Sequence, residues 1–273
     1  MERYFLAKRR LFEPGEGAPI VNLDDEYGRR LAVEIGSPVT YAVEHEADYR
    51  ARDVRFDPAG ASFTCDTPDG PLELETRLPG LFNVQNALAA VAAARSLGVE
   101  PAVIRTALAA AGRVPGRFEP VDEGQDFTVL VDYAHTPEAL DNVLRAARQI
   151  TRGRLHVVFG AGGDRDRGKR PLMGRVASEL ADRVIVTSDN PRSEDPEAIV
   201  DEVLAGTSGG PEREVDRRRA IARALESAAA GDVVVIAGKG HEQGQEFAGG
   251  RKEPFDDVTV AREALRAAQR VGA

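Results

Sequence analysis

The chain has 273 residues, 42% of them hydrophobic and 30% charged, and its formal net charge is −9 at pH 7. This composition is typical of a folded globular protein and unlike that of a disordered chain. The acidic balance argues against nonspecific nucleic-acid binding, which depends on a basic surface. The length is enough for two ordinary domains.

The first half is predicted to contain two groups of helices around a strand-rich stretch. In chain order we expect a helix over 2–12, a short strand over 20–23, a helix ending near 35, antiparallel strands over 38–78, and helices over 81–98 and 101–111. Asp24 and Asp25 offer N-cap side chains for the second helix. Pro and Gly in residues 112–117 indicate a joint, which predicts one domain over 1–113 and another over 114–273.

The second half alternates strands and helices. Strands are predicted at about 127–132, 154–159, 183–187 and 232–236, and helices at about 137–150, 169–181, 196–205 and 216–230. Short strands that are apolar on both faces and separated by helices predict a parallel sheet covered on both sides. We therefore expect a Rossmann-like, doubly wound α/β domain, in which ligands bind at the carboxyl ends of the strands.

Targeting and redox signals are sparse. The single cysteine, Cys65, cannot form an internal disulfide, and no Cys/His cluster indicates a zinc site. Residues 1–12 lack the apolar run of a secretion signal, and no segment approaches the ~20 apolar residues that span a bilayer. We expect a cytoplasmic monomer with neither a membrane nor a nucleic-acid partner.

Polar clusters follow each of the four predicted strands. They are Asp132–Pro137, Gly160–Arg170, Asp189–Arg192 and Gly238–Glu242. Each has a plain alternative: a helix cap at Thr136-Pro137, a solvated glycine-rich loop, an Asx-Pro turn, and a connecting loop. The second cluster is neither a dinucleotide fingerprint nor a phosphate loop of the G-x-x-x-x-G-K-[ST] type. Four such clusters on consecutive strands predict a polar site for anions and an amine.

Together these clusters resemble the Mur ligase family. The blocks that carry the resemblance are VDYAHTP (131–137), FGAGGDRDRGKRPLMG (159–174), TSDNPRSEDP (187–196) and AGKGHE (237–242). In the first half, NLDDEYGRRLA (22–32) and PGLFNVQNALAAVAAA (79–94) are similar to the family's central ATPase domain. The resemblance covers nearly the whole chain, and the blocks look most like the members that add meso-diaminopimelate.

The resemblance implies an ATP-dependent ligation in peptidoglycan biosynthesis. ATP would phosphorylate the free carboxylate of UDP-N-acetylmuramoyl-L-alanyl-D-glutamate, and the amine of meso-diaminopimelate would attack the acyl phosphate. The amide, ADP and phosphate would follow from collapse of a tetrahedral intermediate. Because charge develops on phosphoryl and carbonyl oxygens, Mg²⁺ and fixed cations would carry much of the catalysis.

Site roles follow from the resemblance residue by residue. Lys8 matches the lysine that is carbamylated in the family and then helps to hold magnesium, although by itself it looks like an ordinary surface lysine. Asn86, Arg117 and Asp132 match nucleotide contacts, and His135 is expected beside them as a catalytic candidate. The expected amino-acid pocket comprises Arg165, Asp189, Asn190, Pro191, Arg192, Gly238 and Glu242. A bidentate arginine at 192 would select the distal carboxylate that distinguishes diaminopimelate from lysine.

The resemblance also implies parts that this sequence does not contain. The family has a UDP-binding domain and a phosphate loop ending in Gly-Lys-Thr or Gly-Lys-Ser, so we expect the carboxy-terminal part of such a ligase, inactive alone. Its first half would be weakly stabilised by a sheet with an exposed edge, and its second half would fold independently. The rivals are a lysine-adding Mur ligase, folylpolyglutamate synthase, a non-catalytic amino-acid-binding remnant and, least supported, a nicotinamide oxidoreductase.

Overall fold

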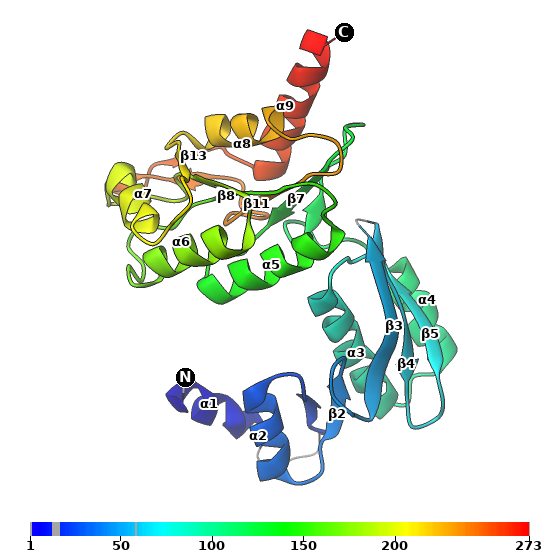
Figure 1. Cartoon of the computed structure of the whole chain (residues 1–273). Coiled ribbons are helices and arrows are strands. Elements are labelled where there is room, and N and C mark those ends of the chain that lie inside the picture. Colours follow the sequence, from blue (N-terminus) through cyan, green and yellow to red (C-terminus); the bar gives the residue numbers. More distant parts are fainter. Residues whose placement is uncertain (1, 13–16, 58, 273) are drawn as a thin grey trace. The chain divides into compact units, whose positions relative to one another are not determined.

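The chain folds as two compact units, residues 1–112 and 113–273, and each is described by itself (Figure 1). The structure is a computed structural model that describes residues 2–12, 17–57 and 59–272. Among these residues, no helix combines the length and the apolar character needed to cross a bilayer.

The first unit is built on a five-stranded sheet with the strand order β1-β2-β3-β4-β5. Its strands are β1 (Ile20–Asn22), β2 (Val39–Ala42), β3 (Tyr49–Asp57), β4 (Gly60–Asp66) and β5 (Leu72–Thr76). Its helices are α1 (Glu2–Arg9), the 3₁₀ turn η1 (Arg10–Phe12), α2 (Glu26–Ile35), α3 (Leu81–Ser96) and α4 (Pro101–Ala110). Strand β1 lies at one edge of this sheet and β5 at the other.

The core of the first unit lies between the sheet and helix α3. Alanine-rich α3 buries Val84, Leu88 and Val91 against Phe63 and Leu74 of the sheet. The antiparallel prediction for residues 38–78 is right for β3, β4 and β5 but wrong for β2, which pairs with both β1 and β3 in parallel. Strand direction depends on where the connections run, and periodicity in the sequence does not report it.

Two adjacent aspartates before helix α2, Asp24 and Asp25, accept hydrogen bonds from different parts of the chain. Asp25 is the N-cap, and its carboxylate accepts a hydrogen bond from the backbone N–H of Gly28 at 2.8 Å. Asp24 instead accepts from the backbone N–H groups of Val43, Glu44 and His45. Burial by itself would raise the pKa of Asp24, but these hydrogen bonds outweigh it and lower the pKa below its ordinary value.

The second unit contains a six-stranded sheet with the order β10-β9-β8-β11-β7-β6. The strands are β6 (Glu119–Pro120), β7 (Thr128–Asp132), β8 (Leu155–Phe159), β9 (Arg183–Val186), β10 (Glu212–Arg213) and β11 (Val233–Ala237). All neighbours are parallel except β6, which is antiparallel to β7. A two-stranded ribbon, β12 (Gln245–Glu246) with β13 (Lys252–Glu253), follows β11, and η2 (Ala248–Gly250) lies between its strands.

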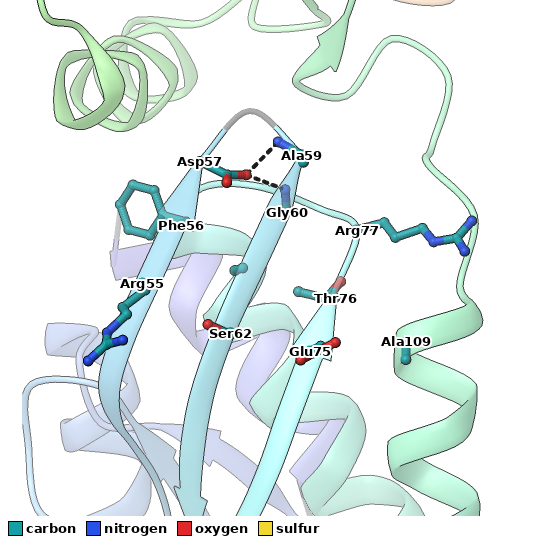
Figure 2. Close-up of a pocket in the computed structure, with 11 residues that line it drawn as sticks. Arg55, Phe56, Asp57, Ala59, Gly60, Ser62, Glu75, Thr76, Arg77 and Ala109 are labelled. Atoms are coloured by element: carbon teal, nitrogen blue, oxygen red, sulfur yellow. Dashed lines mark hydrogen bonds between the residues drawn. The ribbon is translucent and has the colours of Figure 1, made fainter.

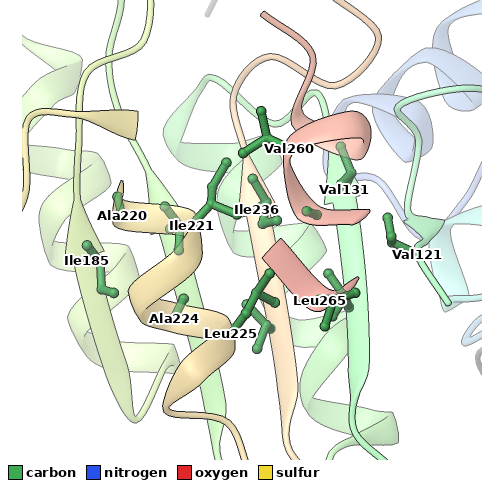
Figure 3. Packing of buried hydrophobic residues seen from close by; sticks show 14 residues of the cluster. Val121, Val131, Ile185, Ala220, Ile221, Ala224, Leu225, Ile236, Val260 and Leu265 are labelled. Atoms are coloured by element: carbon green, nitrogen blue, oxygen red, sulfur yellow. The ribbon is translucent and has the colours of Figure 1, made fainter. Parts of the chain in front are cut away.

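Helices cover both faces of this sheet (Figure 1). They are α5 (Pro137–Ile150), α6 (Lys169–Leu180), α7 (Pro196–Leu204), α8 (Arg217–Glu226) and α9 (Asp257–Gly272). Helices α8 and α9 pack Ile221, Leu225 and Leu265 onto Val131 and Ile236 of the central strands (Figure 3). The predicted doubly wound α/β fold is therefore confirmed.

The sequence correctly predicted the helix cap of α5 in this unit, but it did not predict the shorter elements or the last helix. Thr136 caps α5 by accepting from the backbone N–H of Ala139 at 3.2 Å, and Pro137 occupies the first turn. The sequence reading did not include β6, β10, the β12–β13 ribbon or helix α9. Apart from helix α9, these elements are two-residue strands. Such short strands form by pairing with residues that are distant in the sequence, so no local sequence pattern predicts them.

Candidate active site at the carboxyl edge of the second sheet

The loops that follow four strands of the second unit lie together at the carboxyl edge of its sheet. Strands β7, β11, β8 and β9 are adjacent and parallel, so their carboxyl ends point the same way. The loops that begin at Tyr133, Gly160, Thr187 and Gly238 therefore gather there, as the fold class predicts. Contacts between these loops define a polar cluster.

The centre of the cluster is a hydrogen-bonded set of Asn190, Lys239 and Glu242. Lys239 Nζ donates to Asn190 Oδ1 at 2.8 Å, and Asn190 Nδ2 donates to Glu242 Oε2 at 2.8 Å. Lys239 Nζ also lies 3.4 Å from Glu242 Oε2, and Tyr133 Oη donates to Glu242 Oε1 at 3.4 Å. Burial would raise the pKa of Glu242, but Asn190, Lys239 and Tyr133 together hold that pKa below its ordinary range. Glu242 is thus an anion at neutral pH.

Asp189 is buried beside this set, next to the backbone of Gly238. Its Oδ1 lies 3.7 Å from Lys239 Nζ, and its carbonyl accepts from Gln245 Nε2 at 2.7 Å. Gly238 has φ +121°, and a Cβ atom there would lie 2.5 Å from Asp189 Oδ2. Both the conformation and the contact require glycine at this position. Its backbone can therefore approach a bound molecule closely.

Arg192 provides the cationic end of the cluster. Its Nε donates to Glu246 Oε2 at 3.0 Å, and its Nη1 donates to the carbonyl oxygen of Gly163 at 2.8 Å. The residue has φ +51°, a left-handed conformation that is uncommon outside glycine, and its backbone N–H donates to the Glu246 carbonyl at 3.0 Å. The guanidinium is partly exposed, and the described residues provide no hydrogen bond to its Nη2. It can therefore meet a carboxylate from solution.

The glycine-rich loop after β8 brings a second arginine close by. A Cβ atom at Gly162 would lie 3.0 Å from Arg192 Nη1 and 3.8 Å from Arg165 Cγ, so the two arginine side chains flank one glycine. Arg165 is exposed and donates only to the carbonyl of its neighbour Asp164 among the described contacts. Predicted pocket residue Pro191 is buried, and its carbonyl oxygen lies against Gly163.

Beneath this loop, Arg170 ties two loops together. It is fully buried, donates twice to Glu194 and once to Glu202, each at 2.8 Å, and also donates to the Gly162 carbonyl at 3.2 Å. Hydrogen bonds from Arg170 are the main reason that the pKa of Glu194 falls to about 2. The ion pair fixes the loop after β8 against the loop after β9, which holds Arg165 and Arg192 near each other.

The predicted nucleotide residues of this unit surround Tyr133. The Arg117 guanidinium lies 4.9 Å from the Tyr133 ring centroid, and the exposed His135 ring packs edge-on against it at 4.6 Å. His135 Nδ1 donates to the Tyr133 carbonyl at 2.8 Å, so Nε2 points away from this contact. Asp132 is buried and accepts from the backbone N–H groups of Phe118 and Ala134. Burial raises the pKa of Asp132 above its ordinary value.

The predicted site residues of the first unit are exposed. Lys8 lies on α1 with Nζ 5.7 Å from the Tyr4 ring centroid, and it lines a largely apolar hollow of about 350 Å³ with Phe5 and Tyr27. Asn86 lies on α3 and donates to Asn83 Oδ1 at 3.2 Å. The described residues contain no group of three His, Cys, Asp or Glu side chains that could hold a metal ion.

A second hollow of the first unit, of about 520 Å³, lies at the end of strands β3, β4 and β5 (Figure 2). Asp57 closes the turn there by accepting from the backbone N–H groups of Ala59 and Gly60. Arg55 and Arg77 line the hollow but point away from each other (Figure 2). None of the site residues predicted from the sequence lines it.

Several residues of the cluster were not identified from the sequence. Glu246 pairs with Arg192, Gln245 holds the Asp189 backbone, and Tyr133 reaches Glu242. Lys239 lies in the predicted Gly238–Glu242 cluster but was assigned no role, and the structure buries it completely. A motif containing charged residues does not report which of them face the ligand, because burial depends on the neighbouring loops.

Comparisons with known proteins agree with this architecture. Residues 1–94 match the model of the Mur ligase middle domain, and residues 116–240 match that of the Mur ligase glutamate ligase domain. The chain is 51% identical over 270 residues to the UDP-N-acetylmuramoyl-L-alanyl-D-glutamate--2,6-diaminopimelate ligase of Gloeobacter violaceus, covering 97% of this chain and 55% of that protein. For the protein of the same name from Streptomyces avermitilis, identity is 48% over 281 residues, with coverages of 98% and 55%.

Solved structures give the same result. A structure of a UDP-N-acetylmuramoyl-L-alanyl-D-glutamate--2,6-diaminopimelate ligase is 39% identical, with a TM-score of 0.66 and coverage of 98% of this chain and 57% of that one. The MurF ligase from Thermotoga maritima, solved in complex with ADP, has a TM-score of 0.69 at 18% identity, which shows a shared fold. The chain spans about half the length of the curated relatives it matches. Two consecutive domain matches and identities near 50% along nearly the whole chain place this protein in the Mur ligase family.

Proposed function

We propose that the polar cluster of the second unit binds meso-diaminopimelate, as the amino-acid side of an ATP-dependent ligase. The product would be an amide with UDP-N-acetylmuramoyl-L-alanyl-D-glutamate in peptidoglycan synthesis. The observation that carries the proposal is that one sheet edge presents both a partly exposed cation, Arg192, and a separate anion, Glu242. The relatives' names support the substrate.

Arg192 and Glu242 suit the two ends of this amino acid. A carboxylate can accept two parallel hydrogen bonds from a guanidinium, and an ammonium is attracted to a partly buried carboxylate such as Glu242. Arg192 already donates through Nε to Glu246, so an incoming carboxylate would share or displace that partner. Lysine lacks the distal carboxylate and would leave the arginine with its resting contacts. The site therefore favours diaminopimelate over lysine.

The ATP side of the reaction rests on the family and on fewer contacts. We propose Arg117 and Asp132 as nucleotide contacts and His135, which lies against Tyr133, as a catalytic candidate beside them. Asn86 of the first unit is proposed separately as a nucleotide contact. The proposed role of Lys8 as a carbamate is a covalent modification, which mass spectrometry of the purified protein can detect. As a carbamate, Lys8 would help to hold Mg²⁺, which would neutralise the charge that develops on the phosphoryl oxygens. A cytoplasmic location and a monomeric state stay predictions.

Isothermal titration of the 273-residue chain with meso-diaminopimelate and with L-lysine tests the proposal. We expect diaminopimelate to bind more tightly, and Arg192→Ala to reduce the discrimination by at least about 1.4 kcal/mol, or tenfold. Arg183→Ala is the matched control, because Arg183 begins strand β9, whereas Arg192 lies in the loop that follows the other end of that strand. Equal discrimination before and after the Arg192 change would contradict the proposed role.

The same titration, together with a ligation assay, separates the rival functions. A lysine-adding ligase would prefer lysine, and a folylpolyglutamate synthase would bind neither ligand with selectivity. A non-catalytic remnant would bind diaminopimelate normally, but the complete gene product would form no amide in an ATP-dependent ligation assay.

A further inference from the structure

Lys239 is a fully buried lysine at the centre of the cluster. Its side chain is 0% exposed, so it cannot reach a ligand in solution. A lysine carries three N–H donors and is seldom buried without partners. Here the acceptors around Nζ are Asn190 Oδ1 at 2.8 Å, Glu242 Oε2 at 3.4 Å and Asp189 Oδ1 at 3.7 Å. All three belong to residues proposed to form the diaminopimelate pocket.

The contacts of Lys239 fix the orientation of the Asn190 amide. Asn190 Oδ1 accepts from Lys239 Nζ and from the backbone N–H of Glu246 at 3.0 Å, while Nδ2 donates to Glu242 Oε2. A flipped amide would place its NH₂ group against two donors and its oxygen against a carboxylate. The ammonium therefore sets the direction of the Asn190 amide, and through it the position of Glu242.

Lys239 also balances the charge of two carboxylates, the buried Asp189 and the partly exposed Glu242. Glu242 accepts from Tyr133 Oη of the loop after β7 and from Asn190 of the loop after β9, and Asp189 lies near the same Lys239 ammonium. Arg217 on α8 interacts electrostatically with both Asp189 and Glu242, but its guanidinium donates its hydrogen bonds to the Asp257 carboxylate. Without the ammonium, two carboxylates would lie close together with no cation in direct contact. Like charges so placed disfavour ionisation of one of them.

We propose that Lys239 is a positioning residue that keeps Glu242 ionised and oriented to receive the ammonium of the amino-acid substrate. The ligand part of this inference rests on the proposed function, whereas the effect on Glu242 is a property of the unliganded protein. The two can therefore be tested apart.

The first test is a ¹³C NMR titration of the glutamate carboxyl carbons in the unliganded 273-residue chain, with Glu242 assigned by its loss in Glu242→Gln. Lys239→Met removes the charge and the donors, and Lys239→Gln removes the charge but keeps a donor. In either variant we expect the Glu242 midpoint to move upward by about one pH unit or more, the effect of losing an opposite charge at this distance. Lys252→Met, which removes an exposed lysine from the adjacent ribbon, should leave it unchanged.

The second test is a binding cycle with meso-diaminopimelate near neutral pH. We expect Lys239→Met to raise Kd about tenfold and the Lys239→Met/Glu242→Gln double variant to bind no more weakly than Glu242→Gln, because the lysine acts through Glu242. An unmoved Glu242 midpoint in a folded Lys239 variant, or additive losses in the cycle, would overturn the inference. Absence of diaminopimelate binding by the unmodified chain, with a moved midpoint, would overturn the proposed function and leave the role of Lys239 standing.

Discussion

The ion pair between Arg217 and Asp257 leads to a sharp prediction about stability. Both side chains are 0% exposed, and Arg217 donates to the two Asp257 oxygens at 2.8 and 2.7 Å. Arg217 Nη2 also donates to the carbonyl of Ala237, the last residue of β11, at 3.0 Å. The pair therefore joins the beginning of α9 to the strand end that precedes Gly238. Asp257→Ala would leave the guanidinium buried without its counter-ion.

The expected cost follows from that burial. Breaking a buried ion pair by removing one partner typically costs about 3–5 kcal/mol, a large fraction of the 5–15 kcal/mol that stabilises an ordinary domain. Asp189 and Glu242 still act on Arg217 electrostatically, which favours the lower end of the range. For a domain of this size each kcal/mol lowers the Tm by about 2–4 °C, so we expect a fall of about 6–20 °C.

Tyrosine content makes the measurement specific to one unit. The chain has five tyrosines, and Tyr133 is the single one within residues 113–273. In a chain labelled with fluorotyrosine, the ¹⁹F resonance of Tyr133 reports unfolding of the second unit, and the other four report the first. Removing both charges in Arg217→Met/Asp257→Ala should recover much of the loss, since no charge is then buried alone. A Tyr133 midpoint unchanged in Asp257→Ala, or a double variant as unstable as the summed single changes, would refute the reasoning.

Three further predictions concern acid stability, thiol reactivity and turnover. Burial would raise the pKa of Asp232, but hydrogen bonds from the Arg154 and Ala229 backbone and from His156 lower that pKa below its ordinary value. The Asp232 carboxylate therefore stabilises the fold above about pH 4, and this stabilisation is lost as the pH falls through the folded pKa. Asp232→Asn should therefore lower stability at pH 7 and flatten its acid dependence in urea titrations; an unchanged acid limb would contradict this. Burial raises the pKa of the Cys65 thiol to about 12, so Cys65 should resist alkylation at pH 8 until urea unfolds the first unit, and rapid labelling of the native chain would count against the packing described. The 273-residue sequence contains no G-x-x-x-x-G-K-[ST] loop, so an ATP-dependent ligation assay on it should show no steady product, and sustained turnover would show that phosphoryl transfer does not need that loop.

The sequence predicted best what is decided locally. The Thr136 cap depends on an oxygen three residues before the N–H group it meets, and the four long parallel strands depend on short apolar runs. The loops carrying Asn190, Arg192 and Glu242 could be assigned to one edge, because parallel strands end together. These inferences need no knowledge of which strand lies beside which.

What the sequence did not predict depends on distant neighbours. Strand β11 lies between β7 and β8, and that insertion brings Lys239 under the loop that follows β9. The burial of Lys239 is a consequence of this strand order, and its motif by itself is equally compatible with a lysine that faces solvent. Helix α9 was missed, although Val260 and Leu265 lie on one apolar face, because the preceding ribbon offered no regular pattern from which to continue.

The close contact between the backbones of Gly116 and Gly240 in the second unit has a consequence for the construction of chimeras between members of this family. Gly116 has φ +65°, and a Cβ atom there would lie 2.2 Å from the backbone nitrogen of His241 and 2.3 Å from the carbonyl carbon of Gly240. A Cβ atom at Gly240 would in turn lie 2.7 Å from Tyr133 Cβ. A chimera joined at residues 112–113 inherits both sides of this crossing from one parent. A junction a few residues later would set the loop that bears Glu242 against a foreign segment, so the packing of that loop in a chimera depends on where the chains are joined.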